Sequence, residues 1–342
     1  MVLLLGLTII SFLLTSLLLV PFIDLLFNLR KKYFKGQDSE AAVEAIRKSD
    51  SDTPIHDQLM KADFGTPHGG GIIIIPLVVV FSFLVLWWRQ SLESEWALIA
   101  LTMLSFGALG LIDDIRHIAQ SRAGKFKGLP TRVIFSVQLI LATIIAISLH
   151  FNFGFNNLYL PILGNVILGA WYIPLAVLAI MSFANGVNIS DGLDGLSSGL
   201  LTICLVAFLV LAHSVFDVTI GVMVGIWLGA LIAYLYFNVF PARVYLGDAG
   251  AFGFGATLAV IGLLTGKIFA LGIIGGMFMV ILLSSFAQIV SKRFWGKKIF
   301  PVAPLHMYFK YIGWPEPKVA ARFWLAGAMC AVFGLWLGLF AK

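Results

Sequence analysis

The sequence predicts an all-α polytopic membrane protein with about ten transmembrane helices, and three observations support this fold class. Hydrophobic residues make up 60% of the 342 residues and charged residues only 12%, which is about half the charged fraction of a soluble protein. Apolar runs of about 20 residues, the length that spans a bilayer, recur along the chain. Lysine and arginine fall almost entirely into alternate loops between these runs.

Ten apolar runs are long enough to cross a membrane. They lie near residues 2–27, 70–88, 96–112, 133–151, 167–184, 196–213, 218–238, 250–266, 268–290 and 323–341. The first run is too long for the apolar core of a signal peptide and no small-residue cleavage site follows it, so we expect it to remain as a span. Only Gly266 and Lys267 separate the eighth run from the ninth.

The loops between these runs fall into two sets that differ in charge. One set carries 20 of the 23 lysines and arginines and consists of residues 28–69, 113–132, 185–195, 239–249 and 291–322. The other set carries only Arg89, Lys267 and Lys342. Because basic loops remain in the cytoplasm, we expect the first set to be cytoplasmic and both termini to lie outside. Residues 1–342 are then a single integral membrane domain with its active site on the cytoplasmic face.

The stretch from Asn185 to Gly195 places two carboxylates, Asp191 and Asp194, between long uncharged runs. No Asp, Glu, Lys or Arg occurs at residues 133–190, and none occurs at residues 195–216. Because charge is costly in or near hydrocarbon, such an isolated acidic pair indicates a functional site.

The acidic residues of the later cytoplasmic loops are concentrated at the ends of spans, beside glycines or in pairs. Beyond the first loop they are Asp113, Asp114, Asp191, Asp194, Asp248 and Glu316. Any single one could be a simple helix cap, but clustered carboxylates need a counter-charge. Oxygen ligands without a Cys–His set favour a hard cation, Mg²⁺ or Mn²⁺, and Mg²⁺ commonly takes further ligands from water and phosphate. The pattern therefore predicts a metal site that acts on a phosphorylated substrate.

Basic side chains that could bind phosphate follow the first Asp pair directly. They are Arg116, Arg122, Lys125, Lys127 and Arg132. Two histidines are candidates for the same role, because His117 lies in this loop and His306 shares its loop with several lysines. His150 and His213 lie near the outer ends of spans and are expected to be structural.

In combination these motifs resemble the polyprenyl-phosphate N-acetylhexosamine-1-phosphate transferases. The matching pieces are Lys61 with Thr66-Pro67, Gly110–Asp114, Asn185–Leu196, Asn238–Ala242 with Tyr245–Gly250, and Pro304–His306. The tail from Gly313 to Trp324 is similar to the phospho-N-acetylmuramoyl-pentapeptide branch of that family. Five pieces in the same order, all on the predicted cytoplasmic side, are far more specific than any one of them.

The resemblance implies a role for each matching residue. Asp248 would bind Mg²⁺, and Asp113, supported by Asp114, would act on the polyprenyl phosphate. The residues lining the nucleotide-sugar and diphosphate site would be Asn185, Asn188 and Asp191, with His306 near the phosphates or the sugar. The residues binding uridine would be Lys61, Asp194, Asn238 and Tyr245, with Tyr245 stacking on the base. The remaining expected substrate-binding residues are Thr66, Arg116, His117 and Lys127.

The chain departs from the family pattern at three places. His117, beside Arg116, stands where the family usually has lysine. Ile134 stands where the family usually has another lysine, and Arg132 is the nearby basic residue that could compensate. The family has a run of three histidines at His306, and here Met307 and Tyr308 stand in place of the second and third.

The resemblance also implies a reaction. Phospho-N-acetylmuramoyl-pentapeptide would pass from its UDP-linked donor to undecaprenyl phosphate, giving lipid I and UMP at the bacterial cytoplasmic membrane. Membrane lipid and a second copy of the chain are the implied partners, and nucleic acid is not. A transferase that uses UDP-N-acetylglucosamine or a related donor is the alternative within the family. From other classes, a cation-coupled transporter would place its carboxylates near mid-membrane, and an inactive scaffold would show no Mg²⁺-dependent turnover.

Overall fold

The structure is a computed structural model that describes residues 2–33, 66–121, 128–160, 164–214 and 217–340. Among these residues, ten helices are long and apolar enough to cross a membrane. The expected number of spans is therefore confirmed, and the chain is a multi-pass membrane protein.

The long helices follow the apolar runs of the sequence closely. They are α1 (Val2–Tyr33), α4 (Gly70–Trp88), α5 (Ser94–Ser121), α6 (Thr131–Phe151), α7 (Tyr172–Ser190), α8 (Leu196–Ser214), α9 (Val218–Asn238), α10 (Gly247–Leu264), α12 (Gly276–Trp295) and α14 (Glu316–Phe340). Three short helices accompany them: η2 (Gly169–Trp171), α11 (Ile268–Ile274) and α13 (Leu305–Tyr311).

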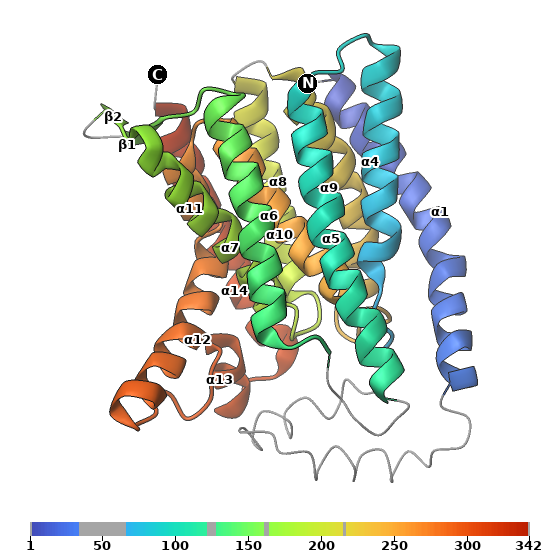
Figure 1. Ribbon diagram of the computed structural model, residues 1–342. Coiled ribbons are helices and arrows are strands. Elements are labelled where there is room, and N and C mark those ends of the chain that lie inside the picture. The colour runs from blue at the N-terminus through green and yellow to red at the C-terminus, as the bar shows by residue number, and fades with distance from the viewer. Residues whose placement is uncertain (1, 34–65, 122–127, 161–163, 215–216, 341–342) are drawn as a thin grey trace.

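The all-helical expectation needs one small correction at the loop before α7. Strands β1 (Asn157–Leu160) and β2 (Gly164–Ile167) pair there in an antiparallel hairpin, with Asn157 opposite Ile167. Figure 1 shows this hairpin at the same end of the bundle as both chain ends. The shared position of the two ends agrees with an even number of spans.

The ninth span also differs from the sequence expectation, because the run from 268 to 290 is divided at Gly275. Helix α11 ends there, and α12 begins afresh at Gly276 and continues to Trp295. The ring of Phe183 presses against Gly275, where an added Cβ would come within 2.2 Å of it. After the break, α12 slants away from the bundle, as Figure 1 shows at the lower left.

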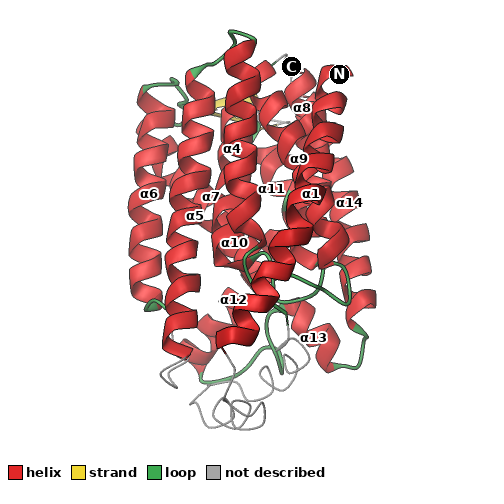
Figure 2. Cartoon of the chain, turned by 90° about the vertical axis from the view of Figure 1, so that its right-hand side faces the viewer, coloured by secondary structure: helices red, strands yellow, loops and turns green. Residues whose placement is uncertain are grey.

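Helix α10 forms the centre of the bundle and packs against α5, α7 and α4. Every residue of α10 except Asp248 is buried, and Figure 2 shows the helix inside the bundle beside α5. Glycines permit the close approach: a Cβ at Gly110 of α5 would lie 2.1 Å from the Asp248 carbonyl oxygen, and one at Gly71 of α4 would lie 2.3 Å from Gly250. Small residues at such contacts are typical of packed membrane helices.

Candidate active site

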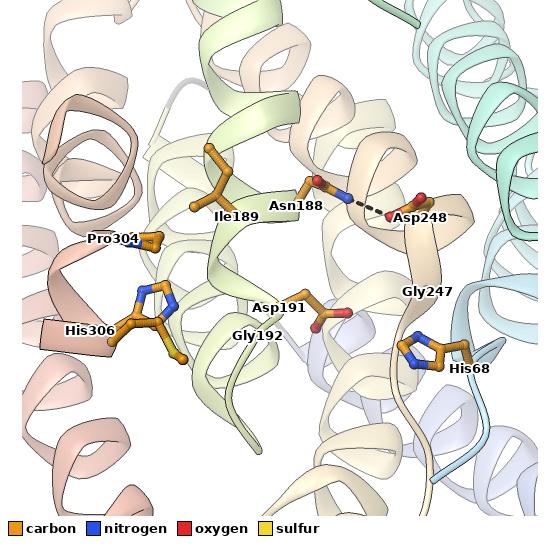
Figure 3. Close-up of a pocket in the computed structure, with 10 residues that line it drawn as sticks. His68, Asn188, Ile189, Asp191, Gly192, Gly247, Asp248, Pro304 and His306 are labelled. Atoms are coloured by element: carbon orange, nitrogen blue, oxygen red, sulfur yellow. Dashed lines mark hydrogen bonds between the residues drawn. The ribbon is translucent and has the colours of Figure 1, made fainter. Parts of the chain in front are cut away.

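A cavity of about 280 Å³ lies where α7 ends and where α10 and α13 begin. Its lining residues are His68, Asn188, Ile189, Asp191, Gly192, Gly247, Asp248, Pro304, His306 and Met307. Figure 3 shows polar side chains from four distant parts of the chain converging on this space. The structure therefore brings together four of the residues singled out in the sequence: Asn188, Asp191, Asp248 and His306.

Asp248 occupies the first turn of α10, where the positive end of the helix dipole favours a carboxylate. The Asn188 side-chain amide, on the last turn of α7, donates to Asp248 Oδ1 at 2.7 Å, which is the dashed line in Figure 3. The carboxylate is thus oriented by one hydrogen bond while its residue still lines the cavity.

The Asp113–Asp114 pair lies beside Asp248 but does not line the cavity. Asp114 Oδ1 and Oδ2 accept the backbone N–H groups of Asp248 and Ala249, each at 3.1 Å. Asp114 therefore caps the start of α10 and holds Asp248 in place. Asp113 is buried with its carboxyl next to that of Asp248, and it accepts the backbone N–H of Leu129.

Asp191 follows the last residue of α7, and its carboxylate extends toward the cavity in Figure 3. Burial raises the pKa of Asp191 well above its usual value, the negative charge of Asp248 raises it further, and the N–H of Gly247 lowers it. Two carboxylates that line one cavity favour either a proton or a bound cation near them.

His306 reaches the cavity from the first turn of α13 and is 1% exposed. Its Nε2 lies near the turn after Asp191, where a Cβ added at Gly192 would come within 3.6 Å. Met307 also lines the cavity, whereas the Tyr308 ring packs near Phe300, with centroids 6.1 Å apart. Met307 and Tyr308 replace two histidines of the family, and of these two residues only Met307 lines the cavity.

Asp194 lies in a buried network beside the cavity rather than on its wall. Its Oδ1 accepts the Tyr245 hydroxyl at 2.6 Å, and its Oδ2 accepts the Ala242 N–H at 2.8 Å. Its own N–H donates to Glu316 at 2.9 Å, and Glu316 pairs with Lys310 at 2.9 Å. Asp194 thus joins the turn after α7 to the loop before α10 and to α14, and its uridine role stays a prediction.

Asn238 and Thr66 hold the backbone of the loop before α10. Asn238 is 1% exposed, accepts the hydroxyl of Ser198 and donates to the Val244 carbonyl at 2.9 Å. The Thr66 hydroxyl donates to the Ala242 carbonyl at 3.1 Å. In this arrangement neither side chain lines the cavity.

The other expected substrate-binding residues lie farther from the cavity wall. Asn185 is one turn deeper in α7 and donates to Gln138 of α6 at 2.9 Å. Arg116 and His117 are exposed on α5 and do not line the cavity. The two lysines, Lys61 and Lys127, lie outside the described residues.

His68 also lines the cavity, although it was not among the site residues predicted from the sequence. The available signal was its place in Thr66-Pro-His-Gly-Gly-Gly71, because dense glycine beside a span indicates close backbone approach. That approach occurs: the N–H groups of Gly69 and Gly70 both donate to the Tyr245 carbonyl, at 3.1 and 2.9 Å.

A divalent cation fits the donor set of the cavity, although no preassembled cluster holds one. Within the described residues, no three His, Cys, Asp or Glu side chains form a group that could hold a metal ion. Mg²⁺ usually binds through one or two carboxylates and completes its shell with water and substrate phosphate. Asp248 and Asp191, both lining the cavity, satisfy that smaller requirement.

Comparison with known proteins identifies the family. A model of glycosyl transferase family 4 matches residues 96–266. A phospho-N-acetylmuramoyl-pentapeptide-transferase of Thermodesulfovibrio yellowstonii is 35% identical over an alignment of 294 residues that covers 79% of each chain. The enzyme of that name from Bacillus subtilis is 32% identical over 277 residues, 80% of this chain and 84% of its own. The chain belongs to glycosyl transferase family 4.

Membership in glycosyl transferase family 4 confirms the resemblance to the family, and the relatives named phospho-N-acetylmuramoyl-pentapeptide-transferase support its pentapeptide branch. The matched region runs from α5 into the turn after α10 and contains Asp113, Asp191 and Asp248. His68 and His306, which complete opposite walls of the cavity, lie outside that region. They come from the two ends of the chain that flank the family core.

Proposed function

We propose that the protein transfers phospho-N-acetylmuramoyl-pentapeptide from its UDP-linked donor to undecaprenyl phosphate, giving lipid I and UMP in peptidoglycan synthesis. The observation that carries this proposal is the 35% identity, over 79% of both chains, to a transferase of that name. The cavity agrees with it, because carboxylates and imidazoles at the end of a helical bundle suit a phosphorylated donor and a lipid acceptor.

The reaction is a displacement at phosphorus. An oxygen of the lipid phosphate attacks the β-phosphorus of the donor, and the bond from that phosphorus to the bridging oxygen breaks, so that UMP leaves with this oxygen. The protein contributes mainly positioning and charge stabilisation. Asp113, whose carboxyl is buried next to Asp248, would accept a proton if the lipid phosphate carries one.

Mg²⁺, or Mn²⁺ in its place, is the cofactor of this proposal. Asp248 would hold the ion and Asp191 would contribute from the adjoining turn, and the ion would neutralise charge on the diphosphate. Asn188 keeps the Asp248 carboxylate oriented through its 2.7 Å hydrogen bond. Asp114 keeps the helix start in place through two backbone hydrogen bonds.

We further place the cavity on the cytoplasmic face of the bacterial inner membrane. Both chain ends lie at one end of the bundle and α13, which bears His306, lies at the other, as Figure 1 shows. Among the described basic residues, Lys292 and Arg293 end α12 and Lys310 ends α13, at that same end of the bundle. The positive-inside rule assigns this end to the cytoplasm. The family resemblance also implies a homodimer, and light scattering of the purified protein would test this.

The decisive assay is release of UMP by purified protein in detergent, supplied with undecaprenyl phosphate and UDP-N-acetylmuramoyl-pentapeptide. Release that needs both the lipid and Mg²⁺ is the expected result. Release only with UDP-N-acetylglucosamine would assign the protein to the alternative activity within the family. The replacement of two family histidines by Met307 and Tyr308 is the reason to test this donor. Absence of release with both donors would favour an inactive scaffold, and ion flux without UMP release would favour a transporter.

A further inference from the structure

A second imidazole faces the cavity from the wall opposite His306. His68 precedes α4, is exposed, and lines the same space as Asp191 and Asp248. In Figure 3, His68 and His306 lie on opposite sides of Asp191. A ligand that occupied the cavity would therefore meet an imidazole on each side.

The backbone around His68 is held by a short ladder to the loop before α10. The Tyr245 N–H donates to the Pro67 carbonyl at 2.9 Å, and the Gly69 N–H donates to the Tyr245 carbonyl at 3.1 Å. His68 and Tyr245 thereby form a parallel bridge, and their rings lie 5.1 Å apart between centroids. The Tyr245 hydroxyl donates to Asp194 at 2.6 Å, which fixes the Tyr245 ring. The imidazole of His68 therefore packs against a ring that is held in place.

The charges on the cavity wall indicate what this imidazole can bind. Asp191 and Asp248 are the carboxylates among the described lining residues, and His68 and His306 are the side chains there that can carry positive charge. The Asn188 amide already donates to Asp248. A diphosphate entering this space meets two carboxylates, so it needs protein donors on its remaining sides as well as a metal ion.

We propose that His68 donates an imidazole N–H to the diphosphate of the donor substrate, from the wall opposite His306, and so holds the β-phosphate in line for attack. This inference rests on the proposed transferase function. A neutral imidazole carries one N–H donor and an imidazolium carries two, so the contact needs no particular charge state. The aromatic contact to Tyr245 orients the ring, and the residue lines the cavity that the substrate would enter.

The test compares UDP with uridine, because only UDP carries the diphosphate. Binding of each to the purified full-length protein in detergent with Mg²⁺ would be measured by calorimetry. His68→Phe keeps a ring against Tyr245 but removes the donor, and His68→Gln keeps a donor. His213→Gln is the matched control, because His213 is an exposed histidine at the outer end of α8.

His68→Phe should weaken UDP binding by about 10- to 100-fold, the loss expected for one hydrogen bond to a charged group. Uridine binding should stay unchanged, His68→Gln should recover part of the UDP affinity, and the His213 variant should match the parent. Unchanged UDP binding in His68→Phe would overturn the proposal. Equal losses for UDP and uridine would also overturn it, because they would indicate a contact to the base or a folding defect.

Turnover gives an independent reading of the same variants. If His68 positions the β-phosphate, His68→Phe should lower kcat for UMP release as well as raise KM for the donor, whereas a purely structural residue would lower the amount of folded enzyme without changing KM. A parent protein that releases no UMP would refute the transferase function. The UDP and uridine affinities do not depend on turnover, so they would still decide the role of His68.

Discussion

Replacing Gly110 by alanine should displace the end of α10 that bears Asp248 and lower turnover strongly. A Cβ at this position would lie 2.1 Å from the Asp248 carbonyl oxygen, whereas ordinary contacts begin at 3.4 Å, so α5 and α10 must separate by about 1.3 Å. Both partners are backbone or Cβ atoms, so no rotamer change can relieve the contact. Overpacking of this kind destabilises by about 1–3 kcal/mol, and a shift of about 1 Å at a reacting centre lowers the rate about 100-fold.

The matched control is Gly6→Ala in α1, where an added Cβ meets nothing within 4 Å. Alanine is favoured over glycine inside a helix by about 0.5–1 kcal/mol, so this variant should keep or raise the unfolding midpoint. The two variants should therefore shift thermal stability in opposite directions, and only Gly110→Ala should lower kcat for UMP release. If Gly110→Ala matched the control in both measurements, the close approach of α5 would not be what positions Asp248.

Three further predictions concern charged groups. Asp248→Asn keeps the shape of the side chain but removes its charge, so UMP release should fall by at least about 100-fold with little change in unfolding midpoint; normal turnover in Mg²⁺ would contradict the metal assignment. Lys310→Met removes the 2.9 Å partner of Glu316 and should destabilise by about 3 kcal/mol, because a buried carboxylate loses its counter-charge; adding Glu316→Gln should restore most of the loss, as thermal unfolding would show. Asp217 caps α9 through a 2.7 Å bond from Ile220 N–H, and burial raises its pKa. Its ionisation therefore weakens the fold as pH rises above about 4, the usual carboxyl range. Asp217→Asn, which caps equally well, should raise the unfolding midpoint at pH 7 and leave it unchanged at low pH; an equal change at both values would show that charge is not the cause.

The sequence alone predicted the number of spans and four of the cavity residues, because these features are local. An apolar run of sufficient length identifies a span wherever the rest of the chain lies, and the ten helices follow those runs. Asn188, Asp191, Asp248 and His306 could be selected because each stands beside the end of a span in a glycine- or proline-containing motif. Their convergence on one cavity followed once the spans packed side by side.

Only the tertiary structure shows that Asp113, Asp114 and Asp248 have different hydrogen-bond partners. Adjacent in the sequence, the two residues of the pair differ in partners: Asp114 caps α10, while Asp113 is held by the N–H of Leu129. These contacts depend on how closely α5 approaches α10, and Gly110 sets that distance. Spacing along the chain carries no information about it.

The break between α11 and α12 and the place of His68 were likewise decided by contacts between distant segments. The run from 268 to 290 is apolar throughout its first half and reads as one helix, but the ring of Phe183 from α7 lies against Gly275 and the helix restarts there. His68 joins the site because its backbone pairs with Tyr245, far along the chain. Hydrophobicity and charge therefore determined which segments cross the membrane and which residues are candidates, whereas packing between segments decided which candidates share one cavity.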